Sequence, residues 1–460
     1  MTARHHLPVL APSSLRADGS RAFVYPADTH GRFTTARRVV FAALIAVYAA
    51  LPWVSVGGNP AVFLDIEARR FFLFGAAFNA QDLPLVFFLV TGVGFALLLL
   101  TAVAGRVWCG WACPQTVFLE GIYRRIERAV EGPRETRVRR DKGPWDAGKL
   151  ARKVAKHALF ALVSLLLAHV FISYFVSLPR LYAMVRAAPS AHPEAFAWTF
   201  VIAALLYANF AHFREQLCLG VCPYGRLQGA LTDADSLTVG YDARRGEPRG
   251  KATEPGHGAC VDCNRCVVVC PTGIDIRHGT QLDCIGCTAC IDACDEIMDK
   301  LHRPRGLIRY DSVRGLDGEP RRLWRPRLAA YLALGAVGAL VAGLTLRDRA
   351  DFEANLLRLP GAPYELVEGR VRNAFQIHLV NKRSERATLR IEPSTSPGVE
   401  VVAPLREVTL GPLEGVTVPV FVSVPRASLR GDFGVPITVR ATGGSSRVLT
   451  APCLGPAVSP

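Results

Sequence analysis

The 460-residue sequence predicts a multidomain membrane protein, with a five-helix transmembrane α bundle, a cysteine-rich cytoplasmic insert and a C-terminal immunoglobulin-like β-sandwich. Three observations predict this architecture: long runs without charge, positive charge that alternates between them, and short β-type runs near the C-terminus. Only 20% of the residues are charged and 50% are apolar, whereas soluble domains carry about 25% charged residues. We therefore do not expect a single soluble core.

Five stretches contain no Asp, Glu, Lys or Arg, and each approaches or exceeds the length that a helix needs to cross a hydrocarbon core of about 30 Å. Together they exceed what the buried helices of a large soluble core normally show. We expect a transmembrane helix in each stretch. The stretches are residues 39–56, 85–104, 157–178, 195–213 and 328–346.

The Lys and Arg residues between these helices alternate from one side to the other. Segments 1–38, 105–156 and 214–327 hold 6, 13 and 17 of them, and the loops 57–84 and 179–194 hold 2 each. The positive-inside rule then places the N-terminal arm, the basic loop and the long insert in the cytoplasm, and the C-terminal domain on the opposite side of the membrane. The net charge of +15 therefore indicates topology and attraction to the membrane surface, and no nucleic-acid partner is expected.

The cytoplasmic insert contains two C-x2-C-x2-C-x3-C runs in tandem. This is the pattern of bacterial two-cluster ferredoxins, in which the fourth cysteine of each run binds the other cluster. We therefore expect a ferredoxin-like domain with two 4Fe-4S clusters over about residues 250–305. Zinc needs only four ligands per site and would not require this interleaving. The predicted ligands are Cys260, Cys263, Cys266 and Cys294 for one cluster, and Cys284, Cys287, Cys290 and Cys270 for the second.

Two C-x3-C-P motifs, 109–114 and 218–223, follow the second and fourth predicted helices on the cytoplasmic side. Proline disfavours an α conformation in the residue before it and often begins a helix. We therefore expect Cys113 and Cys222 to be N-caps of helices that begin at the following prolines. A helix N-terminus is expected to lower the pKa of such thiols, and soft thiolates suit Cu(I), zinc or an iron-sulfur cluster. Buried structural cysteines are the alternative. The candidate catalytic and metal-binding residues are Cys109, Cys113, Cys218 and Cys222.

The basic loop has the features of a segment that lies on the membrane surface. Residues 114–131 are predicted to form a helix in the headgroup layer, and residues 132–157 to continue along the surface with Trp145 as an anchor. These basic residues are either solvated topology determinants or a docking site for a partner. Among the histidines only His169 is deep in a predicted helix, which favours a polar contact inside the bundle over a pair of haem ligands.

The composition changes after the fifth predicted helix, and residues 347–460 contain short β-type runs separated by turn residues. This spacing predicts an immunoglobulin-like sandwich. Cys453 is alone in this domain, so no disulfide is expected within it, and binding or scaffolding is its expected use. The runs are residues 371–381, 386–392, 399–402, 416–424, 433–441 and 447–450.

The order of these parts resembles the CcoG family of cytochrome c oxidase accessory proteins, also called the FixG or RdxA family. The resemblance covers nearly the whole chain. It rests on VYPADTHGRF at 24–33, VWCGWACPQTVFLEGIYRRIER at 107–128, REQLCLGVCPYGRLQGAL at 214–231, the tandem cysteine runs at 260–294 and VRNAFQIHLVNK at 371–382.

The resemblance implies a protein of the bacterial inner membrane, with its C-terminal domain in the periplasm. It would reduce Cu(II) to Cu(I) for assembly of a cbb-type cytochrome c oxidase. Copper would be its substrate or transient ligand, and copper transporters or chaperones and oxidase assembly factors its partners. It further implies that the eight ferredoxin cysteines hold clusters and that the four cysteines of the C-x3-C-P motifs handle copper. The cytoplasmic electron donor is unknown, and the sequence leaves the oligomeric state open, a homo-oligomer included.

Two other functions stay open at this point. One is a membrane electron conduit of the quinol-dehydrogenase type that serves a periplasmic reductase, and the other is a non-enzymatic scaffold for oxidase assembly. A quinone site or a periplasmic redox cofactor would favour the conduit, and the sequence indicates neither. A sandwich without redox residues favours assembly.

Overall fold

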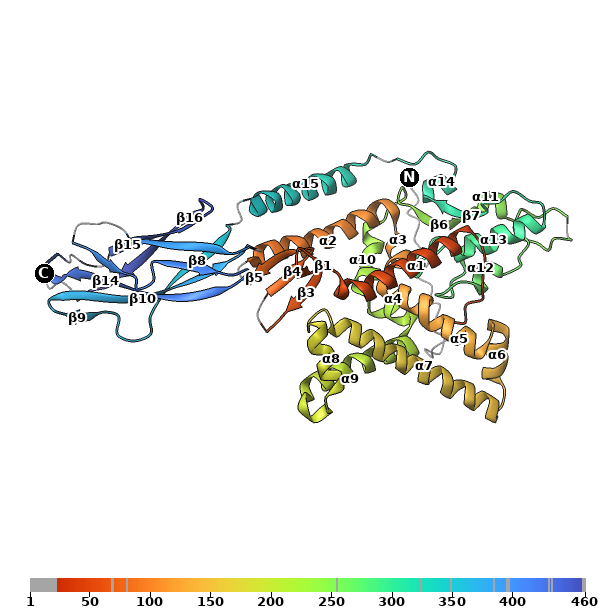
Figure 1. Cartoon of the computed structure of the whole chain (residues 1–460). Coiled ribbons are helices and arrows are strands. Elements are labelled where there is room, and N and C mark those ends of the chain that lie inside the picture. The colour runs from red at the N-terminus through yellow and green to blue at the C-terminus, as the bar shows by residue number, and fades with distance from the viewer. Residues whose placement is uncertain are drawn as a thin grey trace. The chain divides into compact units, whose positions relative to one another are not determined.

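The computed structural model describes residues 23–67, 70–79, 82–253, 255–322, 324–347, 350–383, 385–393, 398–428, 431 and 433–456. The chain divides into two compact units, whose elements are labelled in Figure 1. Unit 1 comprises residues 1–54 and 86–341, and unit 2 comprises residues 55–85 and 342–460.

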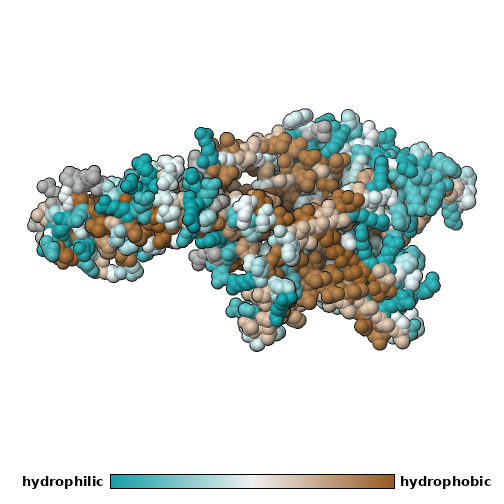
Figure 2. All heavy atoms as spheres, in the orientation of Figure 1, coloured by the Kyte–Doolittle hydropathy of each residue, from teal (hydrophilic) through white to brown (hydrophobic). Residues whose placement is uncertain are grey.

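Five helices are long and apolar enough to cross a membrane, as predicted. Most of each apolar stretch is exposed, and Figure 2 shows the apolar side chains gathered over the helices of unit 1. Exposed apolar surface of this extent is expected where lipid is the solvent. The helices are α1 (Arg32–Ala50), α2 (Leu83–Ala104), α7 (Ala147–Ile172), α9 (Pro193–Ala208) and α15 (Pro326–Arg347).

The first helix begins earlier than the charge-free run indicated, at Arg32 instead of residue 39. The cause is Asp292, whose carboxylate accepts hydrogen bonds from the backbone N–H of Thr34 (2.6 Å) and from its hydroxyl (2.7 Å). Gly31 precedes the helix, and a Cβ there would overlap the carboxyl group of Asp292. A residue of the ferredoxin segment therefore caps the first membrane helix.

The third long helix also begins earlier than predicted, at Ala147 instead of residue 157. The Asp146 side chain caps it by accepting a hydrogen bond of 2.5 Å from the backbone N–H of Lys149. The basic residues between 147 and 156 thus lie on this helix and not along a separate surface segment.

The basic loop forms several short helical elements, of which the three between residues 114 and 131 are continuous. The segment after the first C-x3-C-P motif packs with Leu119 and Tyr123 against Phe160 of α7 and Phe210 of the fourth membrane segment. The elements are α3 (Val107–Trp111), α4 (Pro114–Phe118), the π-helical segment η3 (Leu119–Tyr123), α5 (Arg124–Glu131) and α6 (Arg134–Lys142).

Several charged side chains of this loop are buried in ion pairs, which the sequence did not predict. Glu127 contacts Arg214 at 2.6 Å and Arg137 at 3.0 Å, and Glu131 contacts Lys156 of α7 at 3.1 Å. Burial alone would raise the pKa of Glu127, but the two guanidinium groups outweigh it and hold that pKa below its ordinary value. The interpretation of these basic residues as solvated or partner-docking is therefore wrong for Arg137 and Lys156, which are 6% and 7% exposed.

The remaining helical elements of unit 1 lie between the membrane helices and within the cysteine-rich insert. The strands β6 (Thr238–Tyr241) and β7 (Ile308–Asp311) pair antiparallel and join the two ends of that insert. The helical elements are η1 (Leu51–Trp53), α8 (Leu178–Arg186), η4 (Pro189–Ala191), η5 (Asn209–Phe213), η6 (Leu217–Val221), α10 (Pro223–Leu231), α11 (Ala243–Gly246), α12 (Arg265–Val268), η7 (Ile276–His278), α13 (Ala289–Lys300) and α14 (Val313–Leu316).

Unit 2 begins with strands in the loop between the first two membrane helices. Lys382 of the C-terminal domain reaches Asp82 at 2.9 Å and Glu353 at 3.8 Å, so an ion pair ties this loop to the domain. The strands are β1 (Ser55–Val56), β2 (Asn59–Pro60), β3 (Val62–Asp65), β4 (Arg70–Leu73) and β5 (Ala76–Asn79).

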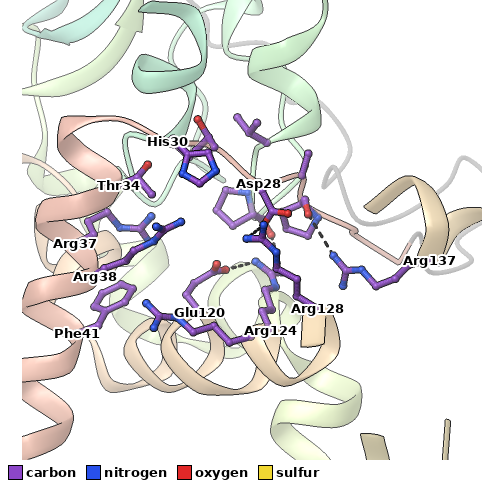
Figure 3. Close-up of a pocket in the computed structure, with 17 residues that line it drawn as sticks. Asp28, His30, Thr34, Arg37, Arg38, Phe41, Glu120, Arg124, Arg128 and Arg137 are labelled. Atoms are coloured by element: carbon purple, nitrogen blue, oxygen red, sulfur yellow. Dashed lines mark hydrogen bonds and ion pairs between the residues drawn. The ribbon is translucent and has the colours of Figure 1, made fainter. Parts of the chain in front are cut away.

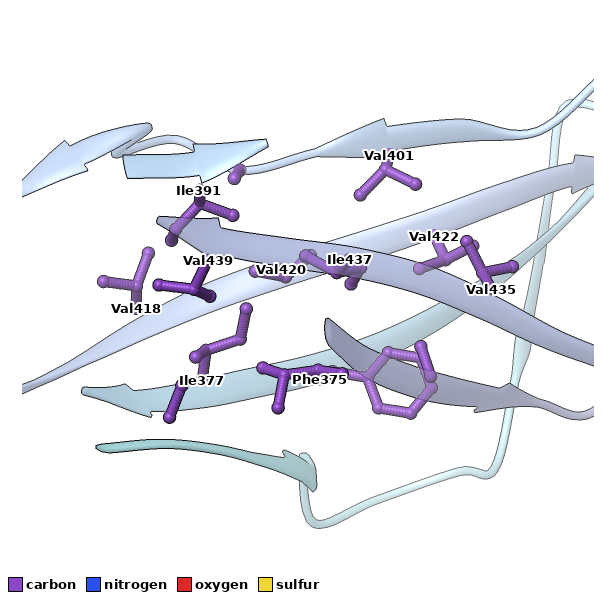
Figure 4. Close-up of a cluster of buried hydrophobic side chains, with 14 of the residues drawn as sticks. Phe375, Ile377, Ile391, Val401, Val418, Val420, Val422, Val435, Ile437 and Val439 are labelled. Carbon is purple, nitrogen blue, oxygen red and sulfur yellow. The ribbon is translucent and has the colours of Figure 1, made fainter. Parts of the chain in front are cut away.

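The C-terminal domain is an immunoglobulin-like sandwich, as predicted. One sheet has the strand order β12-β14-β10-β8 with β9 beside β10, and the other has β13-β11-β15-β16. Alternate residues of β10 and β14 point into the core shown in Figure 4. The strands are β8 (Phe352–Arg358), β9 (Glu365–Val367), β10 (Arg370–Asn381), β11 (Ala387–Pro393), β12 (Glu400–Val402), β13 (Glu407–Leu410), β14 (Gly415–Pro425), β15 (Phe433–Ala441) and β16 (Ser446–Cys453), with the short helix η8 (Arg426–Ser428).

All six predicted runs lie in strands, and β8, β9 and β13 are additional. The β8 strand contains the charged Glu353, which is buried because Lys382 compensates it. A charge in a short run hides the alternation that predicts a strand. Cys453 is a free thiol in the apolar core.

Candidate functional site

The insert places its eight cysteines in two groups, each with three cysteines of one run and the fourth of the other. In the first group, the cysteines line one cavity together with apolar residues that include Met298 and Leu307. Arg277 also lines this cavity and holds the loop through Asn264, whose Oδ1 accepts a hydrogen bond of 2.5 Å. The four cysteines of this cavity are Cys260, Cys263, Cys266 and Cys294.

The second group lies at the start of α13. Burial raises the pKa of Cys290 well above its ordinary value. The charges of the other three thiols of this group, Cys287, Cys284 and Cys270, would raise it further, and that of Cys266 in the first group contributes least. These four thiols are therefore close neighbours. The two groups are those that the interleaved spacing predicts, and their role as cluster ligands stays a prediction.

The donor sets fit two 4Fe-4S clusters. A cluster of this type takes four thiolates, and each group offers four in largely apolar surroundings. Within the described residues, no three His, Cys, Asp or Glu side chains converge on the position of a single metal ion. Separated thiols suit a cluster, in which each iron takes one cysteine, better than a mononuclear zinc ion.

The C-x3-C-P cysteines, which we call the rim cysteines, are placed as predicted at the starts of helices. Cys113 is the N-cap of α4 and Cys222 is the N-cap of α10, each followed by proline. The predicted lowering of the pKa at the helix starts is wrong for Cys113. Burial raises the pKa of Cys109, Cys113 and Cys218, the last to about 12. The amides of α4 do lower the pKa of Cys113, but burial outweighs them.

The rim cysteines from the two motifs come together, which the sequence permitted but did not show. The charges of Cys113, Cys109 and Cys222 would each raise the pKa of Cys218, in addition to its burial. Gln228 of α10 donates a hydrogen bond of 3.3 Å to the sulfur of Cys109. The four thiols do not converge on one ion position, so a bound metal ion would require their side chains to rearrange.

Gln115 also fixes the two motifs relative to each other. Its amide nitrogen donates to the backbone oxygen of Arg214 at 2.9 Å, and its amide oxygen accepts from Asn209 at 2.7 Å. Gln115 follows the first motif, whereas Asn209 and Arg214 precede the second. This contact holds the start of α4 against the end of the fourth membrane segment.

The first rim motif packs directly on the second cysteine run. A Cβ on Gly110 would lie only 2.7 Å from the backbone oxygens of Ile285 and Gly286, so only glycine allows this approach. Arg106 donates hydrogen bonds to the backbone oxygens of Leu282 and Gly225, bridging the second run and the second rim motif. Neither Gly110 nor Arg106 was predicted from the sequence as part of the site. The glycine between the cysteine and the tryptophan of the first motif was the available signal.

Cys109 itself packs against the apolar cluster that contains Cys287. The sulfur of Cys109 and that of Cys284 are close enough for the charge of one to raise the pKa of the other. The rim cysteines and the second cysteine group are therefore adjacent parts of one thiol-rich region.

Two further predictions concern His169 in the third membrane helix and Trp145 before it. His169 bonds through Nδ1 to the backbone oxygen of Leu165 at 2.8 Å, so its polar contact is within its own helix and not with a neighbouring one. Trp145 is 71% exposed, and the Lys149 ammonium lies 4.8 Å from the centre of its ring.

Comparison with known proteins agrees with this arrangement. Residues 213–313 match the family model of a 4Fe-4S dicluster domain, and residues 85–133 match that of a 4Fe-4S binding domain. Residues 342–451 match the Ig-like fold at the C-terminus of FixG. The segment 85–133 contains the first rim motif, so this match associates that motif with iron-sulfur proteins.

Three relatives match most of the chain. Protein RdxA of Cereibacter sphaeroides is 37% identical, with 94% of this chain and 90% of the relative covered. Nitrogen fixation protein FixG of Rhizobium meliloti is 35% identical, with 88% and 87% covered. Protein RdxB of Cereibacter sphaeroides is 36% identical, with 84% of each covered.

Proposed function

Because the chain belongs to the FixG and RdxA family, and is thereby an iron-sulfur electron-transfer protein, we propose that it reduces Cu(II) to Cu(I) for assembly of a cbb-type cytochrome c oxidase. One observation supports this proposal most: Gly110 brings the first rim motif into backbone contact with the second cysteine run. A substrate metal at the rim cysteines would thus lie next to the second cysteine group.

The residues that would hold the two clusters are the two groups of four cysteines described above. When bound, 4Fe-4S clusters supply electrons one at a time. Each Cu(II) ion accepts one electron to become Cu(I), and a reduced soluble carrier in the cytoplasm, the unknown electron donor, is oxidised in turn. Copper transporters or chaperones would deliver the ion and receive it.

The rim cysteines suit the product of this reaction better than its substrate. Cu(II) favours square-planar sites with nitrogen and oxygen ligands, whereas Cu(I) favours thiolates. The thiols of Cys109, Cys113 and Cys218 are protonated at neutral pH because burial raises their pKa. Copper binding would therefore release protons, and Gln228 would orient the Cys109 sulfur by its hydrogen bond.

The test measures copper reduction by the full chain, purified without oxygen and reduced with dithionite that is then removed. A chromogenic chelator specific for Cu(I) reports the product after Cu(II) is added. The double variant Cys109→Ser with Cys218→Ser should lose at least about tenfold in rate, the loss that removing even an outer-shell partner of a metal ligand causes. Cys453→Ala, which removes a thiol buried in the sandwich, is the matched control and should keep the full rate.

The iron content of each variant is measured as well, and the two measurements together distinguish this proposal from the alternatives. Copper reduction that is unchanged in the double variant contradicts the proposal and favours a scaffold. Loss of copper reduction with full iron content supports it.

A second candidate is the membrane electron conduit, with a further iron-sulfur cluster at the rim cysteines. It is favoured by the match of residues 85–133 to a 4Fe-4S binding domain. The conduit predicts about twelve iron atoms per chain instead of about eight, because each 4Fe-4S cluster holds four. It also predicts that the double variant loses the additional iron.

A further inference from the structure

Unit 1 contains a cavity of about 360 Å³ that has no part in the proposed reaction. Figure 3 shows it between the chain before α1, the first turns of α1, and α5. Its volume is in the range of small-molecule pockets. Six arginines line it, against the two carboxylates of Asp28 and Glu120, so its charge is strongly positive. The arginines are Arg37, Arg38, Arg124, Arg125, Arg128 and Arg137.

Three of these arginines already have acidic partners. Arg124 contacts Glu120 and also Glu215, the latter at 3.1 Å. Arg128 contacts Asp28 at 2.5 Å, and Arg137 contacts Glu127 at 3.0 Å. Their positive charge is largely compensated within the protein.

The other three arginines have no ion pair among the residues that the structure describes. Arg38 and Arg125 are exposed at the mouth of the cavity. Arg37 is 7% exposed and uses its Nε to donate to the backbone oxygen of Gly110 at 3.0 Å. Figure 3 shows Arg37 and Arg38 extending from α1 into the cavity. The cavity is therefore lined by cationic hydrogen-bond donors that no acidic side chain compensates among the described residues.

Four buried polar atoms of residues that line the cavity lack hydrogen-bond partners in the described part of the chain, and two of them are the Nε atoms of Arg124 and Arg137. The other two are Nη2 of Arg37 and Oγ1 of Thr29, which is 6% exposed. Leaving a buried donor without a partner costs about 1–3 kcal/mol, and more for a charged group. A ligand with several acceptor oxygens would satisfy both atoms.

We propose that this cavity binds the phosphate group of an anionic ligand, through Arg37, Arg38, Arg125 and the Thr29 hydroxyl. Guanidinium groups match phosphate oxygens in pairs, which makes arginine the preferred residue for such sites. The cavity is larger than a phosphate alone would need. The ligand is therefore a phospholipid headgroup from the cytoplasmic leaflet or a soluble phosphate ester.

The position of the cavity gives such a ligand access from both sources. Arg37 and Arg38 lie in the first turns of a membrane helix, where basic pockets bind anionic headgroups. The cavity is also lined by Pro271 and Ala289, which directly adjoin Cys270 and Cys290 of the second cysteine group in the sequence. This inference does not depend on copper reduction, since none of the residues named for the phosphate belongs to the rim or cluster sites.

The experiment uses the full chain, purified and delipidated in detergent. Isothermal titration with inorganic pyrophosphate tests the soluble source. Binding to nanodisc-reconstituted phosphatidylglycerol against phosphatidylcholine, with bound lipid counted by native mass spectrometry, tests the membrane source. The double variant Arg38→Gln with Arg125→Gln should weaken binding about tenfold or more, because a hydrogen bond to a charged group contributes at least one power of ten in affinity.

Two further variants keep the inference open to refutation. Arg139→Gln removes an exposed arginine of the neighbouring helix α6, outside the cavity, and should change the affinity less than twofold. Thr29→Val removes only the unpartnered hydroxyl, so it should weaken binding while leaving the unliganded protein at least as stable. Selective binding of either probe that falls in the double variant and not in Arg139→Gln supports the site and identifies the source. Equal losses in both, or no binding of either probe, would overturn it.

Discussion

At the scale of single residues, the crossing of the fourth cysteine between the two runs is the feature that most directly tests the cluster assignment. Cys294 belongs to the second run but lines the cavity with Cys260. We expect about eight iron and eight acid-labile sulfide per chain. Cys294→Ser should perturb the same electron paramagnetic resonance signal as Cys260→Ser, whereas Cys284→Ser should perturb the other signal.

The comparison needs a cysteine that has no role in cluster binding. Cys453→Ala provides it, because Cys453 lies in the sandwich core, and this variant should keep both signals and all the iron. If Cys294→Ser instead affected the signal that Cys284→Ser affects, each run would hold its own cluster and the crossing would be wrong.

Single residues also show which features of the site could be predicted from the sequence and which could not. The grouping of the cysteines follows from their spacing, because short spacings leave the chain little choice of partners. The ionisation of Cys113 does not follow from its place at a helix start. Local amides lower its pKa as expected, but burial raises it more, and burial is set by residues far away in the sequence.

At the scale of elements, buried ion pairs hold α5 between the third and fourth membrane segments. Arg214 is only 1% exposed, and Glu127 is its partner at 2.6 Å. We expect Glu127→Gln to destabilise the protein by about 3–5 kcal/mol, since it removes the ion pair of the buried Arg137 and leaves the buried Arg214 only Glu215, which Arg124 shares. Unfolding of the purified protein, followed by tryptophan fluorescence, measures this loss.

A neighbouring acidic residue provides the control for that measurement. Glu135 of α6 is exposed, and Glu135→Gln makes the same chemical change; surface substitutions of this kind usually change stability by no more than about 0.5 kcal/mol. Equal stability of the two variants would mean that the buried pairs contribute nothing net.

Element boundaries were predictable where a local signal sets them. Proline begins α4 and α10 as the sequence indicated. The start of α1 was not predictable in this way, because its cap is Asp292, which follows it by more than half the chain. Likewise, β8 was missed because Glu353 interrupts its apolar pattern, and only the ion pair with Lys382 explains why that residue is buried.

At the scale of the whole molecule, each compact unit gathers segments that the sequence separates. Unit 2 combines the loop after the first membrane helix with the domain after the fifth, and the contact between Asp82 and Lys382 lies inside it. Unit 1 combines the arm before α1 with the cysteine-rich insert, as the hydrogen bond of 2.9 Å from the backbone N–H of Ala27 to the backbone oxygen of Val268 shows. Spacing along the chain cannot predict pairs of this kind.

The contacts within each unit constrain the membrane topology, because segments outside the membrane that contact one another must lie on the same side of it. Four membrane helices separate the loop at 55–85 from the tail, and four separate the arm before α1 from the insert. An even number returns the chain to the same side in both cases. Five membrane-spanning helices are thus compatible with the contacts within each unit. The sides that the alternation of Lys and Arg predicts are compatible with these contacts as well.

We therefore expect the N-terminus of the full chain to be cytoplasmic and its C-terminus to be periplasmic. Alkaline phosphatase, which is active only in the periplasm, should be active when fused to the C-terminus and inactive when fused to the N-terminus. Green fluorescent protein, which does not fluoresce when exported unfolded, should give the opposite result at both positions and serves as the matched control. If both ends reported the same compartment, the number of membrane crossings would be even, and one of the five apolar helices would not span the membrane.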